Sequence, residues 1–306
     1  MQPIVVDNIV MKYRVKKSVV DALKGISFTV DKGEIFGMIG PDGAGKTSLF
    51  RILTTLLLAE SGNASVDGFD VVKDYKEIRN RVGYMPGKFS LYQDLSVQEN
   101  LEFFATIFNT TIEENYNLIK DIYVQIEPFK TRRAGQLSGG MKQKLALCCA
   151  LIHKPSVLFL DEPTTGVDAV SRKEFWEMLH GLKEQGITIL VSTPYMDEAG
   201  LCDRVALIQK GVILSINTPK GIIGEFKKPL WAVQAKEMFR LMNVIKEDPA
   251  VESCYPFGQH HHVVFKNTVD GREKLLQIAQ IGNFADVVVA SIEPNIEDCF
   301  MALMKE

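Results

Sequence analysis

The spacing of apolar and polar residues changes in a regular order along the chain. Short apolar runs at residues 4–10 and 34–39 predict β-strands, because strand-forming residues are concentrated there between polar turns. Over residues 88–152 the apolar residues often recur at the spacing of an α-helix, for example at residues 97–108. Strand and helix patterns then alternate over residues 155–216, which is typical of a parallel sheet covered by helices. The pattern predicts an α/β fold with a helix-rich insertion.

The segment after Thr218 and Pro219 has a different order of elements. Its strand-like and helix-like patterns fall at residues 230–234, 236–246, 251–255, 262–266, 271–281 and 286–292. This β-α-β-β-α-β order is that of a ferredoxin-like α+β domain, and a last helix is expected at residues 297–304. We therefore expect two domains, at residues 1–218 and 219–306.

Composition and charge narrow the class of function. The chain has 306 residues, 46% of them hydrophobic and 24% charged, with a net charge of −3. Nucleic-acid-binding proteins normally carry a basic patch, so this balance predicts no nucleic-acid partner. No apolar stretch approaches the length that spans a bilayer, and Asp7 and Lys12 interrupt the N-terminus before a signal-peptide core could form. We expect a cytoplasmic protein whose five cysteines are small buried hydrophobes.

A glycine-rich loop separates the run at residues 34–39 from a helix-like segment at residues 48–58. The loop matches G-x-x-x-x-G-K-[ST] and consists of Gly40, Pro41, Asp42, Gly43, Ala44, Gly45, Lys46 and Thr47, with Ser48 next in the chain. In this context the motif predicts a phosphate loop, with backbone N–H groups around the phosphates. Lys46 supplies a positive charge toward the terminal phosphates, and the Thr47 hydroxyl is suited to Mg²⁺. We expect a bound nucleoside triphosphate; a glycine-rich turn without a ligand is the alternative.

Further motifs follow the phosphate loop in a fixed order. Residues 137–141 read LSGGM, an apolar run ends in Asp161 and Glu162, and a short segment ends in Asp168. With this series the chain resembles the ABC transporter ATPases over about residues 1–220. The resemblance implies a P-loop NTPase core that uses ATP and Mg²⁺, a helical subdomain that carries the LSGG signature, and Asp168 in the D-loop.

The resemblance also assigns separate roles to the paired carboxylates. Asp161 would hold Mg²⁺ through water, and Glu162 would polarise the water that attacks the nucleotide. Thr47 would complete the metal site, and Lys46 would contact the phosphates. A solvated strand end is the alternative for the two carboxylates.

Ser138, Gly139 and Gly140 lie at the predicted start of a helix. Free N–H groups and the helix dipole favour an anion there. In ABC ATPases that anion is the γ-phosphate of ATP bound by the opposite subunit; a serine helix cap is the alternative. Tyr13 matches the aromatic residue that stacks on adenine in the family, although an ordinary strand aromatic has the same pattern.

Two positions depart from the family pattern. Where the family has a glutamine that contacts Mg²⁺ and the attacking water, this chain has Gly87. Where the family has a histidine against the γ-phosphate, this chain has Pro194, which has neither an imidazole nor a backbone N–H. Loss of one such donor typically lowers turnover about 10²–10³-fold. MgATP binding is therefore expected to survive better than hydrolysis.

The resemblance leads to a function and a set of partners. We expect an ATP-binding subunit of an exporter of drugs, lipids or other amphipathic compounds, peripheral at the inner face of the cell membrane. Its partners would be membrane permease subunits and a second ATPase in a head-to-tail dimer, as a heterodimer with one strong and one weak site. A regulatory subunit with negligible turnover is an alternative, and a soluble ABC protein of translation or DNA repair is a weaker one.

The C-terminal segment carries two further patterns. Residues 294–300 are similar to a Pro-x-x-Glu-Asp-x-Phe pattern in the C-terminal extension of some drug-export members. His260, His261 and His262 are adjacent, but three consecutive side chains on a strand cannot face one ion, and no acidic residue is spaced with them. We expect a structural hairpin there rather than a metal site.

Overall fold

The computed structural model describes residues 2–15, 18–266 and 270–304. It divides into two compact units with the boundary between Pro219 and Lys220, one residue from the boundary expected from the sequence. Among the described residues, no helix is both long enough and apolar enough to cross a membrane.

The first unit is built on a six-stranded sheet in the order β10-β9-β3-β8-β7-β6. The five strands from β9 to β6 pair in parallel, and β10 is antiparallel to β9. Strands β3, β7 and β8 are buried along their whole length, as expected for a parallel sheet covered on both faces. The strands are β3 (Ile35–Ile39), β6 (Val82–Met85), β7 (Val157–Asp161), β8 (Thr188–Thr193), β9 (Arg204–Gln209) and β10 (Val212–Asn217).

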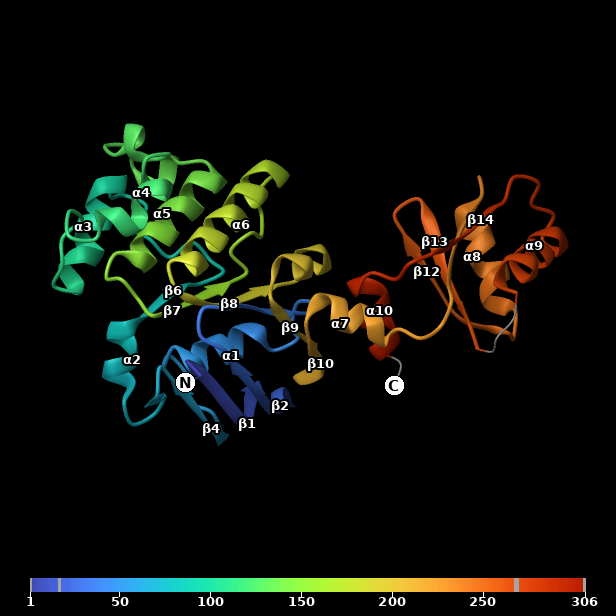
Figure 1. Cartoon of the computed structure of the whole chain (residues 1–306), viewed down its shortest axis with the longest axis horizontal. Helices are drawn as coiled ribbons and strands as arrows, with labels where there is room; N and C mark the ends of the chain where they lie inside the picture. Colours follow the sequence, from blue (N-terminus) through green and yellow to red (C-terminus); the bar gives the residue numbers. More distant parts are fainter. Residues whose placement is uncertain (1, 16–17, 267–269, 305–306) are drawn as a thin grey trace. The chain divides into compact units, whose positions relative to one another are not determined.

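A second, antiparallel sheet in the order β2-β1-β4-β5 completes this unit. Its strands are β1 (Ile4–Val15), β2 (Ser18–Val30), β4 (Ser61–Val66) and β5 (Phe69–Asp70). Helix α1 (Lys46–Leu53) contacts β7 of the first sheet and β2 and β4 of the second, and α6 (Ala169–Glu184) packs on β3 and β8. Figure 1 shows α1 between the two sheets. Apolar side chains from both sheets and α1 form one core, and this core fixes the start of α1 beside the strand ends.

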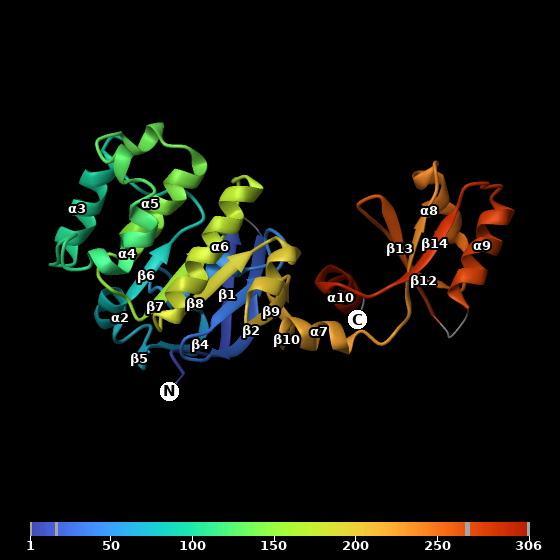
Figure 2. The ribbon, with the colours of Figure 1, turned by 45° about the horizontal axis from the view of Figure 1, so that its top comes forward.

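The helix-rich insertion forms a separate layer of the first unit. Figures 1 and 2 show its helices grouped beyond β6. They are α3 (Val97–Ile107), α4 (Tyr116–Tyr123) and α5 (Gly139–Leu151), with short 3₁₀ turns at Glu127–Phe129 and Ala134–Gln136. A further helix, α2 (Tyr75–Arg81), precedes β6, and a 3₁₀ turn (Met196–Leu201) follows β8.

Some element boundaries differ from those expected from the sequence. The helix after the phosphate loop ends at Leu53 rather than residue 58, because Thr55 has a left-handed φ of 62°. In the helical insertion, α4 starts only at Tyr116, because the residues before it form a turn closed by i→i−3 backbone bonds such as that from the Tyr116 N–H to the Glu113 carbonyl oxygen at 3.4 Å. Strands β4 and β5 form a hairpin around the Asp67–Gly68 turn.

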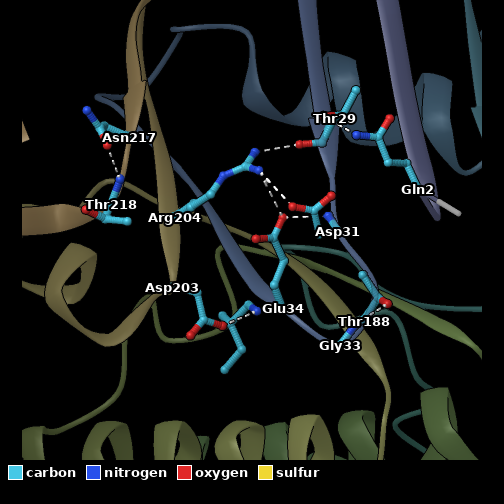
Figure 3. Close-up of polar contacts among 11 residues, drawn as sticks. Gln2, Thr29, Asp31, Gly33, Glu34, Thr188, Asp203, Arg204, Asn217 and Thr218 are labelled. Atoms are coloured by element: carbon cyan, nitrogen blue, oxygen red, sulfur yellow. Dashed lines mark hydrogen bonds and ion pairs between the residues drawn. The ribbon is translucent and has the colours of Figure 1, made fainter. Parts of the chain in front are cut away.

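Polar side chains connect the two sheets at the edge opposite the phosphate loop. The Arg204 guanidinium donates to the Thr29 carbonyl oxygen at 2.7 Å and forms ion pairs with Asp31 at 3.3 Å and Glu34 at 3.8 Å (Figure 3). Burial raises the pKa of the Glu34 carboxyl. In the same region, the hydroxyl of Thr188 accepts the Gly33 N–H at 3.0 Å.

The second unit is a four-stranded antiparallel sheet in the order β12-β13-β11-β14. This order, with α8 and α9 packed over one face, is that of a ferredoxin-like fold and confirms the expectation from the sequence. Its elements are α7 (Pro219–Glu225), β11 (Leu230–Gln234), α8 (Met238–Glu247), β12 (Val251–Phe257), β13 (His260–Phe265), α9 (Gly271–Ile281), β14 (Val288–Ile292) and α10 (Ile296–Leu303).

The adjacent histidines lie on β13 and belong to its packing. His261 Nε2 lies 2.7 Å from the Met238 carbonyl oxygen of α8, whereas His262 Nδ1 lies 2.6 Å from Asp298 Oδ1 of α10. The expectation that no acidic residue accompanies them was wrong, because Asp298 reaches His262 across 36 residues of chain. The Tyr255 hydroxyl donates to the same Asp298 oxygen at 2.5 Å, so this contact fixes α10 to the sheet. No cluster of three or more His, Cys, Asp and Glu side chains that could hold a metal ion occurs among the described residues.

Candidate active site

The phosphate loop connects the end of β3 to the start of α1. Gly45 has a φ of 109°, and a Cβ there would overlap the Ala22 carbonyl oxygen. A Cβ at Gly40 would overlap the carbonyl oxygen of Ile208. Glycine is therefore required at both positions, for conformation and for close approach of the backbone. The loop is held against its neighbours in a shape that leaves Asp42 and Gly43 exposed.

Lys46 and Glu162 face each other across the strand ends. The Lys46 ammonium donates to the carbonyl oxygens of Gly40 at 2.6 Å and Pro41 at 3.1 Å. It also lies 3.1 Å from Glu162 Oε1, with the Lys46 side chain 3% and the Glu162 side chain 22% exposed. The fold thus places the two predicted catalytic residues in direct contact. The two carbonyl oxygens and the carboxylate occupy the three donor positions of the ammonium, so a phosphate oxygen that binds Lys46 has to take the place of one of these partners.

Asp161 lies at the buried end of β7 with few partners. The residue is 2% exposed, and its Oδ1 accepts one hydrogen bond, from the Ser192 hydroxyl at 2.7 Å. Among the described residues, no Lys, Arg or His nitrogen lies within 4.0 Å of this carboxylate. The alternative of a solvated strand end is therefore wrong for Asp161. A buried carboxylate without a cationic partner, together with the half-buried Thr47 hydroxyl on α1, suits a hard divalent cation such as Mg²⁺.

Glu162 has a strained backbone. Its φ of 53° is left-handed, which is uncommon for a residue with a side chain. Its N–H is held by two acceptors of Ser192, the carbonyl oxygen at 3.1 Å and the hydroxyl at 3.0 Å. These bonds fix the direction in which the Glu162 side chain leaves the strand.

The two departures from the family pattern both lie beside these carboxylates. A Cβ built on Gly87 would be 3.0 Å from the Asp161 carbonyl oxygen and 3.8 Å from Glu162 Cβ. Gly87 and Glu162 also line a cavity of about 160 Å³. Pro194 follows β8 directly, next to Thr193, whose carbonyl oxygen accepts the Gly40 N–H at 3.2 Å. Neither position offers a side-chain donor to this edge of the sheet.

The LSGG segment lies on a different part of the first unit. The Ser138 hydroxyl accepts the Met141 N–H at 3.4 Å and so caps α5, as the helix-cap alternative expects. A Cβ on Gly140 would be 2.7 Å from the Ser171 hydroxyl, so α5 and α6 approach closely there. Ser138 and Gly139 are exposed, and the Ser138 hydroxyl bonds within its own helix rather than to Lys46 or Glu162. This part of the surface is accessible to another molecule.

Asp168 and Tyr13 have local partners. The Asp168 carboxylate caps α6 by accepting the N–H groups of Val170 at 3.1 Å and Ser171 at 3.0 Å, and these bonds lower the pKa of Asp168. Tyr13 is half-buried on β1, and its hydroxyl lies 3.0 Å from the Ser48 hydroxyl at the start of α1. Tyr13 is thus next to the phosphate loop; its role toward adenine stays a prediction.

Sequence reasoning did not single out Ser192 or Gln143. Ser192 contacts both Asp161 and Glu162, as described above. The buried Gln143 on α5 donates to the Pro163 carbonyl oxygen and so connects the helical insertion to the segment after Glu162. The alternation of side chains along β8 was the one signal for Ser192, because it places residues 192 and 194 on the same side of the strand.

Comparison with known proteins is consistent with this geometry. The protein-family profile for "ABC transporter" matches residues 23–165. The probable multidrug ABC transporter ATP-binding protein YbhF of Escherichia coli K12 is 45% identical over 203 residues. The alignment covers 66% of this chain but only 35% of YbhF, so the chain spans about a third of that relative.

A second relative aligns along nearly its whole length. The Nod factor export ATP-binding protein I of Rhizobium sp. strain N33 is 34% identical over 299 residues, which is 94% of each chain. Among solved structures, a dimeric ATP-binding cassette in a post-hydrolysis state with ADP and phosphate matches with a TM-score of 0.64. It is 23% identical and covers 70% of this chain and 98% of its own, so it supports the fold alone.

Proposed function

Because the chain belongs to the ABC transporter ATP-binding family and is an ATPase of that type, we propose that it is the ATP-binding subunit of an exporter. Its cargo would be drugs, lipids or other amphipathic compounds. The names of the relatives, which include a probable multidrug protein and a Nod factor export protein, support this class of cargo. In this role the protein binds MgATP and couples its binding and hydrolysis to movement in membrane subunits.

The surroundings of Asp161 and Glu162 support a more specific proposal, which concerns binding and hydrolysis of MgATP. The groups for MgATP binding are present: a buried Lys46 ammonium, the Thr47 hydroxyl and the Asp161 carboxylate. Gly87 lies against this edge without a side chain, and Pro194 follows it without a donor. Each missing donor is expected to lower turnover about 10²–10³-fold. We infer a site that holds MgATP and hydrolyses it slowly.

The partner chain follows from the exposed LSGG segment. Ser138 and Gly139 are exposed at the start of α5, where helix N–H groups favour a phosphate. In a head-to-tail pair, this segment would complete the site of a second ATPase that keeps the glutamine and histidine. The pair would then have one strong and one weak site, and the partner would be a different chain.

A groove next to Gly87 suits the membrane partner. It has a volume of about 480 Å³ and lies between β6 and the helical insertion, with Tyr84, Met85, Phe104, Ile107 and Phe108 among its lining residues. Concave apolar surfaces of this kind accept an amphipathic helix. We propose that a cytoplasmic helix of a permease subunit docks here, which would place the protein at the inner face of the membrane.

A regulatory subunit with negligible turnover is the second candidate. Gly87 and Pro194 favour it, whereas the 3.1 Å contact of Lys46 with Glu162 keeps a carboxylate in place for residual hydrolysis. The two candidate functions differ in how fast this chain's own site hydrolyses ATP. Both include a strong site on the partner ATPase.

Two substitutions in the assembled complex test the asymmetric pair. The chain would be co-expressed with an ATPase subunit that keeps its glutamine and histidine. Ser138→Arg should remove most of the hydrolysis of the complex, because the long side chain fills the γ-phosphate position of the partner's site. Lys46→Ala damages only the weak site and should lower hydrolysis less.

Assembly must be checked for both variants by size-exclusion chromatography with ATP, since Lys46→Ala also removes charge from the dimer interface. If Lys46→Ala were the more harmful change in a complex that still assembles, the asymmetric pair would be wrong. A homodimer with a replacement for the missing histidine would then be the better account.

A further inference from the structure

Ser192 connects the Asp161 carboxylate to the backbone N–H of Glu162 through one hydroxyl group. It lies on β8 opposite Asp161 of β7 and is fully buried. We propose that Ser192 is a positioning residue for ATP hydrolysis, which orients the Asp161 carboxylate toward Mg²⁺ and fixes the backbone from which Glu162 projects. Nothing in the sequence motifs assigns this role.

The hydroxyl makes both contacts at once. It donates to Asp161 Oδ1 at 2.7 Å and accepts the Glu162 N–H at 3.0 Å. A serine hydroxyl has one donor and two acceptor positions, so this arrangement uses the donor for the carboxylate and an acceptor for the amide. The bond to the charged Asp161 is of the stronger, charge-assisted kind.

The effect on Asp161 is orientation. This carboxylate is buried, and the described residues give it no cationic partner and no hydrogen-bond donor other than Ser192. Without the hydroxyl, the carboxylate can rotate about its side-chain torsions, so its oxygens lose a fixed direction. Groups that orient a metal-binding carboxylate typically change metal affinity 10–100-fold when removed.

The effect on Glu162 acts through the backbone. Its φ of 53° persists only where the surroundings hold it, and both acceptors of its N–H belong to Ser192. Loss of the hydroxyl leaves the carbonyl acceptor alone. The backbone that positions the Glu162 carboxylate, 3.1 Å from the Lys46 ammonium, is then held less firmly.

Strand alternation explains why this residue has the role. Thr193 faces the other way, and its hydroxyl accepts the Tyr195 N–H at 3.1 Å. Residue 194, directly after the strand, is a proline without a donor. Among the described side chains of β8, Ser192 is therefore the one that donates a hydrogen bond to the Asp161 carboxylate.

The test compares Ser192→Ala with a control on the same strand. Thr188→Val also removes a buried hydroxyl that accepts a backbone N–H, from Gly33, but at the other end of β8 (Figure 3). Ser192→Thr keeps the hydroxyl. Affinity for a fluorescent ATP analogue would be measured by titration of the full-length variants with Mg²⁺ and with EDTA, and thermal unfolding would report the loss of stability.

We expect Ser192→Ala to reduce the gain in affinity on adding Mg²⁺ by about tenfold while affinity in EDTA stays within about twofold. Thr188→Val should keep the full gain, and Ser192→Thr should restore most of it. An unchanged gain in Ser192→Ala would overturn the proposal. An equal loss of the Mg²⁺-dependent gain in Thr188→Val would also overturn it, because the effect would then be one of strand stability. Slow turnover by the wild type affects neither affinity measurement.

Discussion

Restoring the two missing donors should raise the turnover of this chain's own site. The perturbation is the double substitution Gly87→Gln with Pro194→His, compared with each single change. Both positions lie beside the carboxylates. A Cβ at Gly87 is 3.0 Å from the Asp161 carbonyl oxygen, so the backbone must give by a few tenths of an ångström, and the cavity of about 160 Å³ beside it has room for the side chain.

The expected gain follows from what the donors contribute. One preorganised donor at a reacting centre is worth about 2.7–4 kcal/mol, or about 10²–10³ in turnover. Donors that act on the same group are not additive, so the double variant should gain about 10²–10³ rather than the product of two such factors. Each single variant should gain less, because one of the two donors is still missing from its site.

The assay is phosphate release by homogeneous full-length protein at saturating MgATP. ATP affinity is measured alongside, because Lys46, Thr47 and Asp161 are unchanged and should bind equally in all variants. The Glu162→Gln substitution in the double variant is the control, and it should abolish the gain. A folded double variant that binds MgATP and still shows wild-type turnover would refute the reasoning that Gly87 and Pro194 limit the site.

Two further predictions concern stability and the second unit. Burial lowers the pKa of His153 to about 4, so the neutral imidazole is favoured in the folded state. The neutral His153 therefore contributes its full share to the free energy of unfolding above pH 6.5. This contribution is lost as the pH falls toward 4, and the loss is about 2 kcal/mol at pH 5. Urea unfolding of the wild type and of His153→Gln should differ by this loss, and an identical pH dependence of the two proteins would contradict it. Truncation before Lys220 should leave ATP affinity nearly unchanged while altering dimerisation or transport, because the second unit has its own core. ATP affinity would be measured by calorimetry. A large loss of ATP affinity in a truncated protein that is still folded would refute a regulatory role of the second unit.

The phosphate loop and the order of elements along the second unit were predictable because local patterns determine them. The loop needs glycine where Gly45 adopts a φ of 109°, and the Lys-Thr pair follows at fixed spacing. The β-α-β-β-α-β order was readable from the alternation of apolar residues. Helix ends were less predictable, because a turn of i→i−3 bonds such as that from Tyr116 to Glu113 precedes the regular helix without changing the apolar spacing.

The contacts that sequence reasoning missed join residues far apart in the chain. Ser192 and Asp161 are 31 positions apart, and His262 and Asp298 are 36 apart. Each pair depends on which strands are neighbours and on their register, and the sequence carries no local mark of either. Ser192 looked like an ordinary polar residue at the end of an apolar strand, so its hydroxyl could be placed only once β7 and β8 were known to pair.

The fate of ATP bound to this chain alone tests the central claim most directly. A single-turnover experiment would follow radiolabelled ATP bound to excess full-length protein with Mg²⁺, for the wild type and for Glu162→Gln. The account predicts that both proteins bind ATP, that the wild type retains most of it unhydrolysed over many minutes, and that Glu162→Gln hydrolyses it more slowly still. Rapid hydrolysis by the wild type that Glu162→Gln abolishes would contradict it.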